Sequence, residues 1–188
     1  MKLRLVTTQD ARAVREIYRP AVEENAVSFE EEMPSVMEMC HRIERISRDY
    51  PWWVAEDEGV GVVGYAYAQP FRARSAFRFA LECAVYVDAS YRRRRVARAL
   101  YEKLFRLGEA QGARTWFAAI TLPNAASVAL HESLGFAPAG IWPECGFKQE
   151  RWWDVGLWAR KSELSSETEP VWRPLSSMTG AEIGTLCR

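Results

Sequence analysis

The sequence predicts an α/β domain built on a mixed β-sheet with helices on both faces. Segments with the two-residue alternation of strands and segments with helical spacing follow one another in the order β-α-α-β-β-β-α-β-α-β-β. The clearest change of period lies within residues 81–100, where a strand pattern gives way, after a run of arginines, to a helix pattern. At 188 residues the chain is long enough for one ordinary domain with a substantial core.

The expected strands are recognised by alternating apolar and polar residues between turn-forming residues. They cover residues 2–6, 52–56, 60–69, 77–88, 114–120, 136–142 and 151–158. A turn at residues 57–59 joins the second and third strands, and a loop over residues 143–150 is expected to join the last two. This arrangement predicts one N-terminal strand, three central strands and three later strands in one sheet.

The expected helices carry apolar residues at helical spacing. They begin after Thr7 and near Pro34, Arg94 and Asn124. Thr7 and Asp10 resemble a capping box, and Pro20 is expected to bend or end the first helix. Residues 1–160 are therefore expected to form the domain, and the polar residues 161–188 a tail, extended or partly draped on the body.

Composition excludes several classes of function. Basic and acidic residues balance at 25 each, which argues against a nucleic-acid protein whose affinity depends on phosphate neutralisation. Apolar runs are too short for a membrane span, and charges near Met1 argue against a signal peptide. The four cysteines are scattered and the chain has two histidines, so we expect no metal site and a reduced, cytoplasmic location.

The strand-turn-helix at residues 81–100 is the candidate functional nucleus. A strand that turns directly into a helix directs free backbone N–H groups at the turn, where a phosphate can bind. Glu82 lies upstream on the strand, as a general base or as a carboxylate paired with a neighbouring arginine. The arginines at residues 92–95 have an alternative interpretation, a solvated or nucleic-acid-binding run.

A second candidate is the loop that contains Arg72 and Arg74. Two arginines two residues apart can clamp an anionic group, because a guanidinium binds a carboxylate or phosphinate with two hydrogen bonds. A solvated loop is the alternative, and the residues alone do not choose between them.

Several segments resemble the GNAT superfamily of N-acetyltransferases, and within it the phosphinothricin and methionine sulfoximine acetyltransferases. The matching segments are Tyr50-Pro51-Trp52, Gly64-Tyr65-Ala66-Tyr67-Ala68, Pro70-Phe71-Arg72-Ala73-Arg74, Val85-Tyr86-Val87, Pro123-Asn124-Ala125-Ala126-Ser127, Leu130-His131-Glu132, Leu134-Gly135-Phe136 and Trp153-Asp154-Val155-Gly156. They extend over roughly residues 1–160.

The resemblance implies an enzyme that binds acetyl-CoA, without a metal, between two parallel strands that splay apart. The residues that it implies for acetyl-CoA are Val85, Tyr86, Val87, Arg92, Arg93, Arg94, Arg95, Val96, Ala97, Arg98, Asn124 and Ser133. It implies Glu82 as the base and His131 as an acid or second base. The residues that it implies near the substrate are Phe29, Arg72, Arg74 and Lys148, although Phe29 also fits a core plug. Related enzymes are homodimers, so a homodimer is expected.

The turn departs from the pattern of this family. The usual Q/R-x-x-G-x-G/A here has Arg95 at the middle glycine, and Arg93 stands where relatives commonly have another glycine. Glycine allows phosphate oxygens to approach the backbone and tolerates positive φ. We expect CoA binding to persist, at unchanged or reduced affinity. The alternatives are a protein N-terminal or polyamine acetyltransferase, and a CoA-binding protein without turnover.

Overall fold

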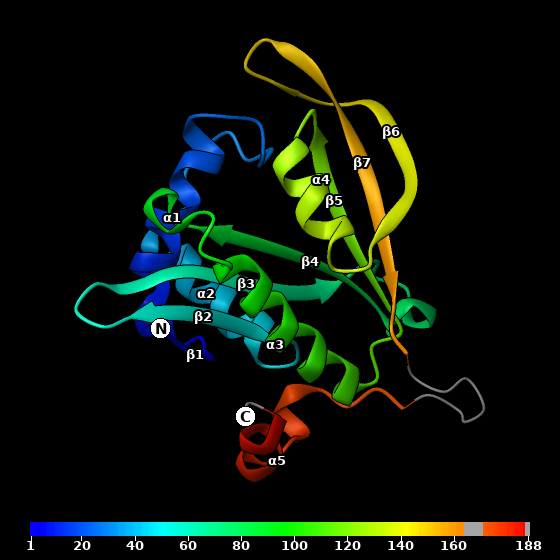
Figure 1. Ribbon diagram of the computed structural model, residues 1–188. Coiled ribbons are helices and arrows are strands. Elements are labelled where there is room, and N and C mark those ends of the chain that lie inside the picture. Colours follow the sequence, from blue (N-terminus) through cyan, green and yellow to red (C-terminus); the bar gives the residue numbers. More distant parts are fainter. Residues whose placement is uncertain (164–170, 187–188) are drawn as a thin grey trace.

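A computed structural model describes residues 1–163 and 171–186, and one seven-stranded sheet forms its centre (Figure 1). The strands are β1 (Lys2–Leu5), β2 (Trp52–Asp57), β3 (Gly61–Pro70), β4 (Ala80–Val87), β5 (Thr115–Leu122), β6 (Ala137–Lys148) and β7 (Arg151–Lys161). Their order in the sheet is β1-β2-β3-β4-β5-β7-β6, and of these pairs only β4 and β5 run parallel. This confirms the predicted α/β class with a mixed sheet.

The helices cover both faces of the sheet, as predicted. They are α1 (Ala11–Glu23), α2 (Val36–Ser47), α3 (Val96–Gln111) and α4 (Ala125–Glu132), with a short α5 (Gly180–Leu186) near the C-terminus. Alternation along β2 separates two cores: Trp52 packs with α1 and α2, whereas Trp53 packs with α3. Each core is apolar enough to hold its helix layer on the sheet.

The first helix does not end at Pro20, which contradicts one of the two alternatives expected for this proline. It continues to Glu23, because Ala21 and Val22 are buried against the sheet and their packing outweighs the local effect of proline. The second helix begins at Val36, two residues later than expected. Ser35 is its N-cap, and the side-chain oxygen of Ser35 accepts a hydrogen bond from the Glu38 backbone N–H.

The expected loop over residues 143–150 was also wrong, because β6 runs through it to Lys148. β6 is an edge strand, where Pro143 can be accommodated without a ladder hydrogen bond, and its register shifts at two places. Gln149 and Glu150, both at positive φ, form the two-residue turn into β7. The result is a long hairpin that extends beyond the end of the sheet (Figure 1).

Residues 171–186 return to the body and pack below α3 (Figure 1). Leu175 and Met178 are buried in the core beside α3, and the Trp172 ring packs on Tyr50. The Leu175 backbone N–H donates to the carbonyl oxygen of Asp49 at 3.1 Å. This segment therefore joins the end of α2 to the core on the opposite face.

Candidate active site

The parallel strands β4 and β5 diverge shortly after they meet. Their register pairs Ala80 with Thr115, Leu81 with Trp116 and Glu82 with Phe117, and it ends there although both strands continue. From Cys83 onward, the β4 edge that faces β5 has no strand partner. A ligand can therefore hydrogen-bond this edge, and the residues expected to do so, Val85, Tyr86 and Val87, all lie on it.

The arginine-rich turn keeps the backbone conformation of a glycine-rich one. Arg93 and Arg95 have φ values of 61° and 62°, in the left-handed region that glycine adopts readily. Arg95 is the N-cap of α3, so this helix begins at Val96 rather than at Arg94 as predicted. The side chains of the four arginines at 92–95 are exposed. A pyrophosphate group thus fits this turn: the helix N-terminus offers N–H groups and the arginines add positive charge.

The remaining residues expected to contact the cofactor lie where α3 and α4 approach each other. The Arg98 guanidinium donates to the Ser133 hydroxyl at 2.8 Å and to its carbonyl oxygen at 3.2 Å. Asn124 is the N-cap of α4, and its side-chain oxygen accepts a hydrogen bond from the Ser127 N–H. The Asn124 contact caps the start of α4, and the Arg98 contacts tie the end of α4 to α3.

Glu82 lies at the last paired position before the strands diverge. It is half-buried, and β3 presents Gln69 directly beside it in the sheet. Burial raises the pKa of the Glu82 carboxyl above its ordinary value, and the positive charge of Arg72 opposes this rise. A carboxylate in this environment is a stronger base than one in water.

An aromatic cavity, which the sequence did not reveal, opens on the sheet face that carries Glu82. Its volume is about 270 Å³. The cavity is lined by Tyr18, Glu30, Glu38, Met39, Arg42, Arg45, Ile46, Trp52, Tyr65, Tyr67 and Gln69. Trp52 is buried, and its indole N–H has no hydrogen-bond partner among the described residues. The cavity thus combines aromatic walls with charged and amide side chains, although its residues come from five segments of the sequence.

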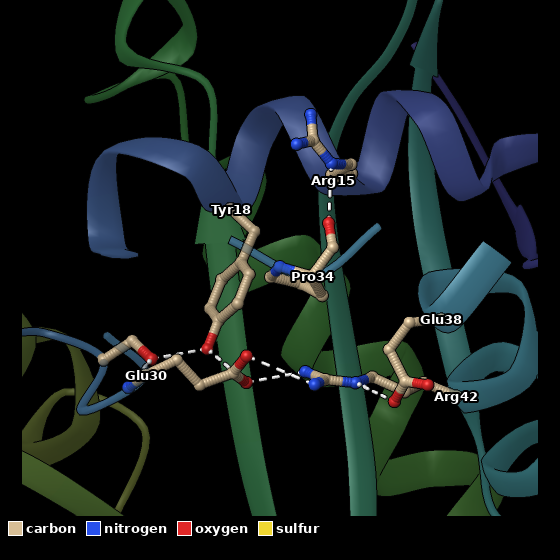
Figure 2. Close-up of polar contacts among 7 residues, drawn as sticks. Arg15, Tyr18, Glu30, Pro34, Glu38 and Arg42 are labelled. Carbon is tan, nitrogen blue, oxygen red and sulfur yellow. Dashed lines mark hydrogen bonds and ion pairs between the residues drawn. The ribbon is translucent and has the colours of Figure 1, made fainter. Parts of the chain in front are cut away.

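A charged network borders this cavity (Figure 2). The Arg42 guanidinium binds both carboxylate oxygens of Glu30, at 2.6 and 3.2 Å, and also Glu38 at 3.0 Å. Figure 2 shows the Tyr18 hydroxyl pointing toward Glu30, to which it donates at 3.0 Å. Burial raises the pKa of Tyr18 to about 12, so it remains a neutral donor. This network orders the segment between α1 and α2.

The expected substrate residues fall into two groups. Arg72 lies near Glu82 and stacks over the rings of Phe71 and Trp142, at 4.1 and 5.5 Å, whereas Arg74 is exposed in the same loop. Phe29, 38% exposed, lies against Gly146 of β6: a methyl group added to that glycine would overlap its ring.

Lys148, the remaining expected substrate residue, is buried. Its ammonium group donates to the backbone carbonyls of Val22 and Ser28. Two hydrogen bonds within the protein therefore hold this side chain.

His131 lies on the other face of the sheet, buried between α3 and α4. Its Nδ1 donates to the Ser127 carbonyl at 2.8 Å, so Nε2 accepts from the Tyr101 hydroxyl at 3.0 Å. Burial lowers the pKa of His131, and the hydrogen bond to Ser127 opposes this. The imidazole is consequently neutral near pH 7. Tyr101 also interacts with Cys83, the first β4 residue beyond the region paired with β5. Tyr101 thus connects His131 to the place where the two strands diverge.

The fold and the site define a protein that binds an acyl-CoA between splayed strands. The model of the acetyltransferase (GNAT) domain matches residues 3–157, so the chain belongs to the GNAT acetyltransferases, enzymes that use acetyl-CoA. Among the described residues, no three His, Cys, Asp or Glu side chains gather in a way that could hold a metal ion. No helix in the same residues is long and apolar enough to cross a membrane.

Similar proteins extend this assignment. The chain is 39% identical over 178 residues to the phosphinothricin N-acetyltransferase of Streptomyces viridochromogenes, with 95% of this chain and 96% of the relative covered. It is 33% identical to the L-methionine sulfoximine/L-methionine sulfone acetyltransferase of Salmonella typhimurium, with 82% and 91% covered. A crystal structure of the Sinorhizobium meliloti phosphinothricin acetyltransferase with acetyl-CoA superposes with a TM-score of 0.85, at 37% identity, covering 90% of this chain and 92% of that one.

Proposed function

We propose that this enzyme transfers an acetyl group from acetyl-CoA to the α-amino group of a small amino-acid-like substrate, of the phosphinothricin, methionine sulfoximine or methionine sulfone type. One observation carries the proposal: Glu82 lies where β4 and β5 separate, on the sheet face that also bears the aromatic cavity. The names of the relatives support the substrate class.

The chemistry requires removal of a proton from an ammonium group, which has no free electron pair. Glu82 is the proposed base, directly or through a water molecule, and its raised pKa suits proton uptake. The neutral amine attacks the thioester carbonyl of acetyl-CoA. The C–N bond forms, the C–S bond breaks, and the second proton lost by the nitrogen balances the charge of the CoA thiolate that leaves. A backbone N–H on the free edge near Val85 stabilises the negative charge that develops on the acetyl oxygen. Val85, Tyr86 and Val87 bind the pantetheine arm along this edge.

Arg72 and Arg74 are proposed to bind the anionic groups of the substrate. Arg72 is close enough to Glu82 to lower its pKa, so an acid held by Arg72 would bring its amine near the base. Phe29 is proposed as an apolar wall of the pocket, and the role of Lys148 is developed in the next subsection. A protein N-terminus or a polyamine remains the alternative acceptor.

His131 is proposed to act as a second base rather than as an acid. Its pKa is lowered, and its Nε2 accepts the hydroxyl proton of Tyr101, which directs proton movement toward the imidazole. His131 is therefore connected through Tyr101 to the point where β4 and β5 diverge, on the sheet face opposite to Glu82.

We further propose a cytoplasmic homodimer in which the β6–β7 hairpin contributes to the interface. The hairpin exposes four large apolar side chains, at 38–60% of their full areas: Ile141, Trp142, Phe147 and Trp152. A group of this size on a soluble protein is typical of an interaction surface. Trp142 also lies beside Arg72, so a partner here would approach the substrate loop. Light scattering should give a dimer, and Trp152→Lys should shift it toward monomer; a monomeric wild-type protein would contradict the proposal.

The decisive test is release of free thiol from acetyl-CoA with phosphinothricin, methionine sulfoximine and methionine sulfone. Glu82→Gln should lower kcat/KM about 10²–10⁴-fold. The exposed Glu58→Gln, in the β2–β3 turn, is the matched control and should leave the rate unchanged. Release with only polyamines or N-terminal peptides would favour the alternative acceptor, and binding of acetyl-CoA without release for any amine would refute turnover.

A further inference from the structure

We propose that Lys148 is a positioning residue that holds the segment between α1 and α2 over the aromatic cavity, where the amine substrate is proposed to bind. This inference depends on the proposed function for the identity of the amine substrate, although the contacts themselves do not. The β6–β7 hairpin supplies Lys148, and residues 24–35 form the segment.

The first observation is the environment of the Lys148 ammonium group. Lys148 is 7% exposed, and its Nζ donates to the carbonyl oxygens of Val22 at 2.6 Å and Ser28 at 2.7 Å. These two carbonyls lie at the end of α1 and in the following loop, so one side chain ties both to the hairpin. The Trp153 indole N–H donates to the Lys148 carbonyl at 2.9 Å and fixes the backbone from which this side chain extends.

A buried ammonium group is costly unless its donors are satisfied, so a bonded lysine here indicates a specific requirement. Burial lowers the pKa of Lys148, and the negative charges of Glu31 and Glu30 oppose this. Both glutamates belong to the segment that Lys148 holds. The lysine therefore stabilises the acidic segment through its charge as well as through hydrogen bonds.

The second observation is a continuous chain of contacts from Lys148 to α2. Ser28, whose carbonyl binds Lys148, shares a 2.5 Å hydrogen bond between its hydroxyl and that of Tyr18. Tyr18 donates to Glu30, and Glu30 forms the ion pair with Arg42 of α2 (Figure 2). Three of these residues, Tyr18, Glu30 and Arg42, line the cavity. This chain of hydrogen bonds therefore links the position of the β6–β7 hairpin to the position of the residues that line the cavity.

The third observation is a packing contact beside the lysine. The ring of Phe29 lies against Gly146, so closely that a Cβ on Gly146 would come within 2.1 Å of it. Gly146 and Lys148 are two residues apart on β6, and Phe29 follows Ser28. The polar and apolar contacts therefore join the same two segments at one place.

This arrangement assigns Lys148 to the binding of the amine substrate rather than to the binding of acetyl-CoA. Loss of its ammonium group should loosen residues 24–30, with Phe29 and Glu30, while the splay and the turn at residues 92–97 keep their geometry. The expected signature is weaker binding of the amine, with acetyl-CoA binding unchanged.

The experiment compares Lys148→Met with Lys161→Met, the same change at the exposed far end of the hairpin. With phosphinothricin as the amine, Lys148→Met should raise KM about 10–100-fold, as expected for loss of hydrogen bonds to a charged group. The value of kcat and the acetyl-CoA Kd from calorimetry should remain within about twofold. Hydrogen exchange, which needs no activity, should accelerate in residues 22–30 and not in α3. Lys161→Met should resemble the wild type in all four.

Unchanged exchange in residues 22–30 of Lys148→Met would overturn the inference, as would a loss of acetyl-CoA affinity equal to the rise in KM. If no amine in the panel is acetylated, the proposed substrate class fails while the exchange measurement still decides the role of Lys148. Tyr18→Phe gives an independent test, since it removes one hydroxyl from the chain of contacts. Tyr18→Phe should accelerate hydrogen exchange in residues 22–30 less than Lys148→Met does. In the double variant, the loss of exchange protection should be smaller than the sum of the two single losses. Full additivity would refute transmission through this chain.

Discussion

Replacement of Arg95 by glycine should make the enzyme more stable. Arg95 has φ 62° and ψ 13°, and an L-residue in the left-handed region costs about 1–2 kcal/mol. Glycine removes this cost but loses about 0.5–1 kcal/mol through the greater entropy of the unfolded chain. The difference is a gain of about 0.5–1 kcal/mol, which for a chain of this length corresponds to a rise in Tm of about 1–4 °C.

The assay is thermal unfolding of Arg95→Gly beside Arg92→Gly. Arg92 is equally exposed, but its φ of −62° lies in the ordinary extended region. Arg92→Gly removes no backbone strain and increases the entropy of the unfolded chain, so its free energy of unfolding should fall by about 0.5–1 kcal/mol. A Tm for Arg95→Gly that falls as far as that of Arg92→Gly would show that the turn is not strained as described.

Three further changes test other parts of the molecule. The raised pKa of Glu82 means that the folded state favours the protonated carboxyl, so the contribution of this group to stability is lost as pH rises through that pKa. Glu82→Gln should therefore raise the Tm at pH 7 while the variant loses activity. An unchanged or lower Tm would contradict this reasoning. Gly108→Ala would bring a Cβ to 2.3 Å from the buried Trp116 ring. Overpacking should cost about 1–3 kcal/mol and the gain in helix propensity should return about 1 kcal/mol, so the free energy of unfolding in urea should fall by about 1 kcal/mol. A stabilised variant would disprove the contact. Burial would raise the pKa of Asp10, but the ion pair with Arg4 and local hydrogen bonds lower it. Asp10→Asn should lose about 2–3 kcal/mol at pH 7, and the difference from wild type should shrink as pH falls through that lowered pKa; a pH-independent difference would contradict it.

Periodicity predicted the order of strands and helices because most elements here have one buried and one exposed face. It was wrong where position in the sheet outweighed local pattern. Pro143 suggested a loop, but at a sheet edge its missing N–H costs little, and β6 continues through it. Pro20 suggested a bend or an end of the first helix, and the burial of Ala21 and Val22 extends α1 past it.

The aromatic cavity could not be predicted in the same way. Tyr18, Arg42, Trp52 and Tyr67 come from α1, α2, β2 and β3, and local spacing does not indicate that they meet. A resemblance led to Lys148, but the sequence alone does not show that two backbone carbonyls surround its ammonium group. Contacts of this kind depend on the tertiary fold rather than on residue type.

The C-terminal segment helps to tie the two helix layers together at one end of the sheet. The Gln111 amide at the end of α3 donates to the carbonyls of Asp49 and Arg173, so the helix layers on opposite faces of the sheet are bonded to each other below it. The two helix layers are therefore held together at this end, and the β6–β7 hairpin lies at the opposite end of the molecule (Figure 1). Any movement that admits the substrate is then expected away from this end, in residues 24–30 beside the cavity.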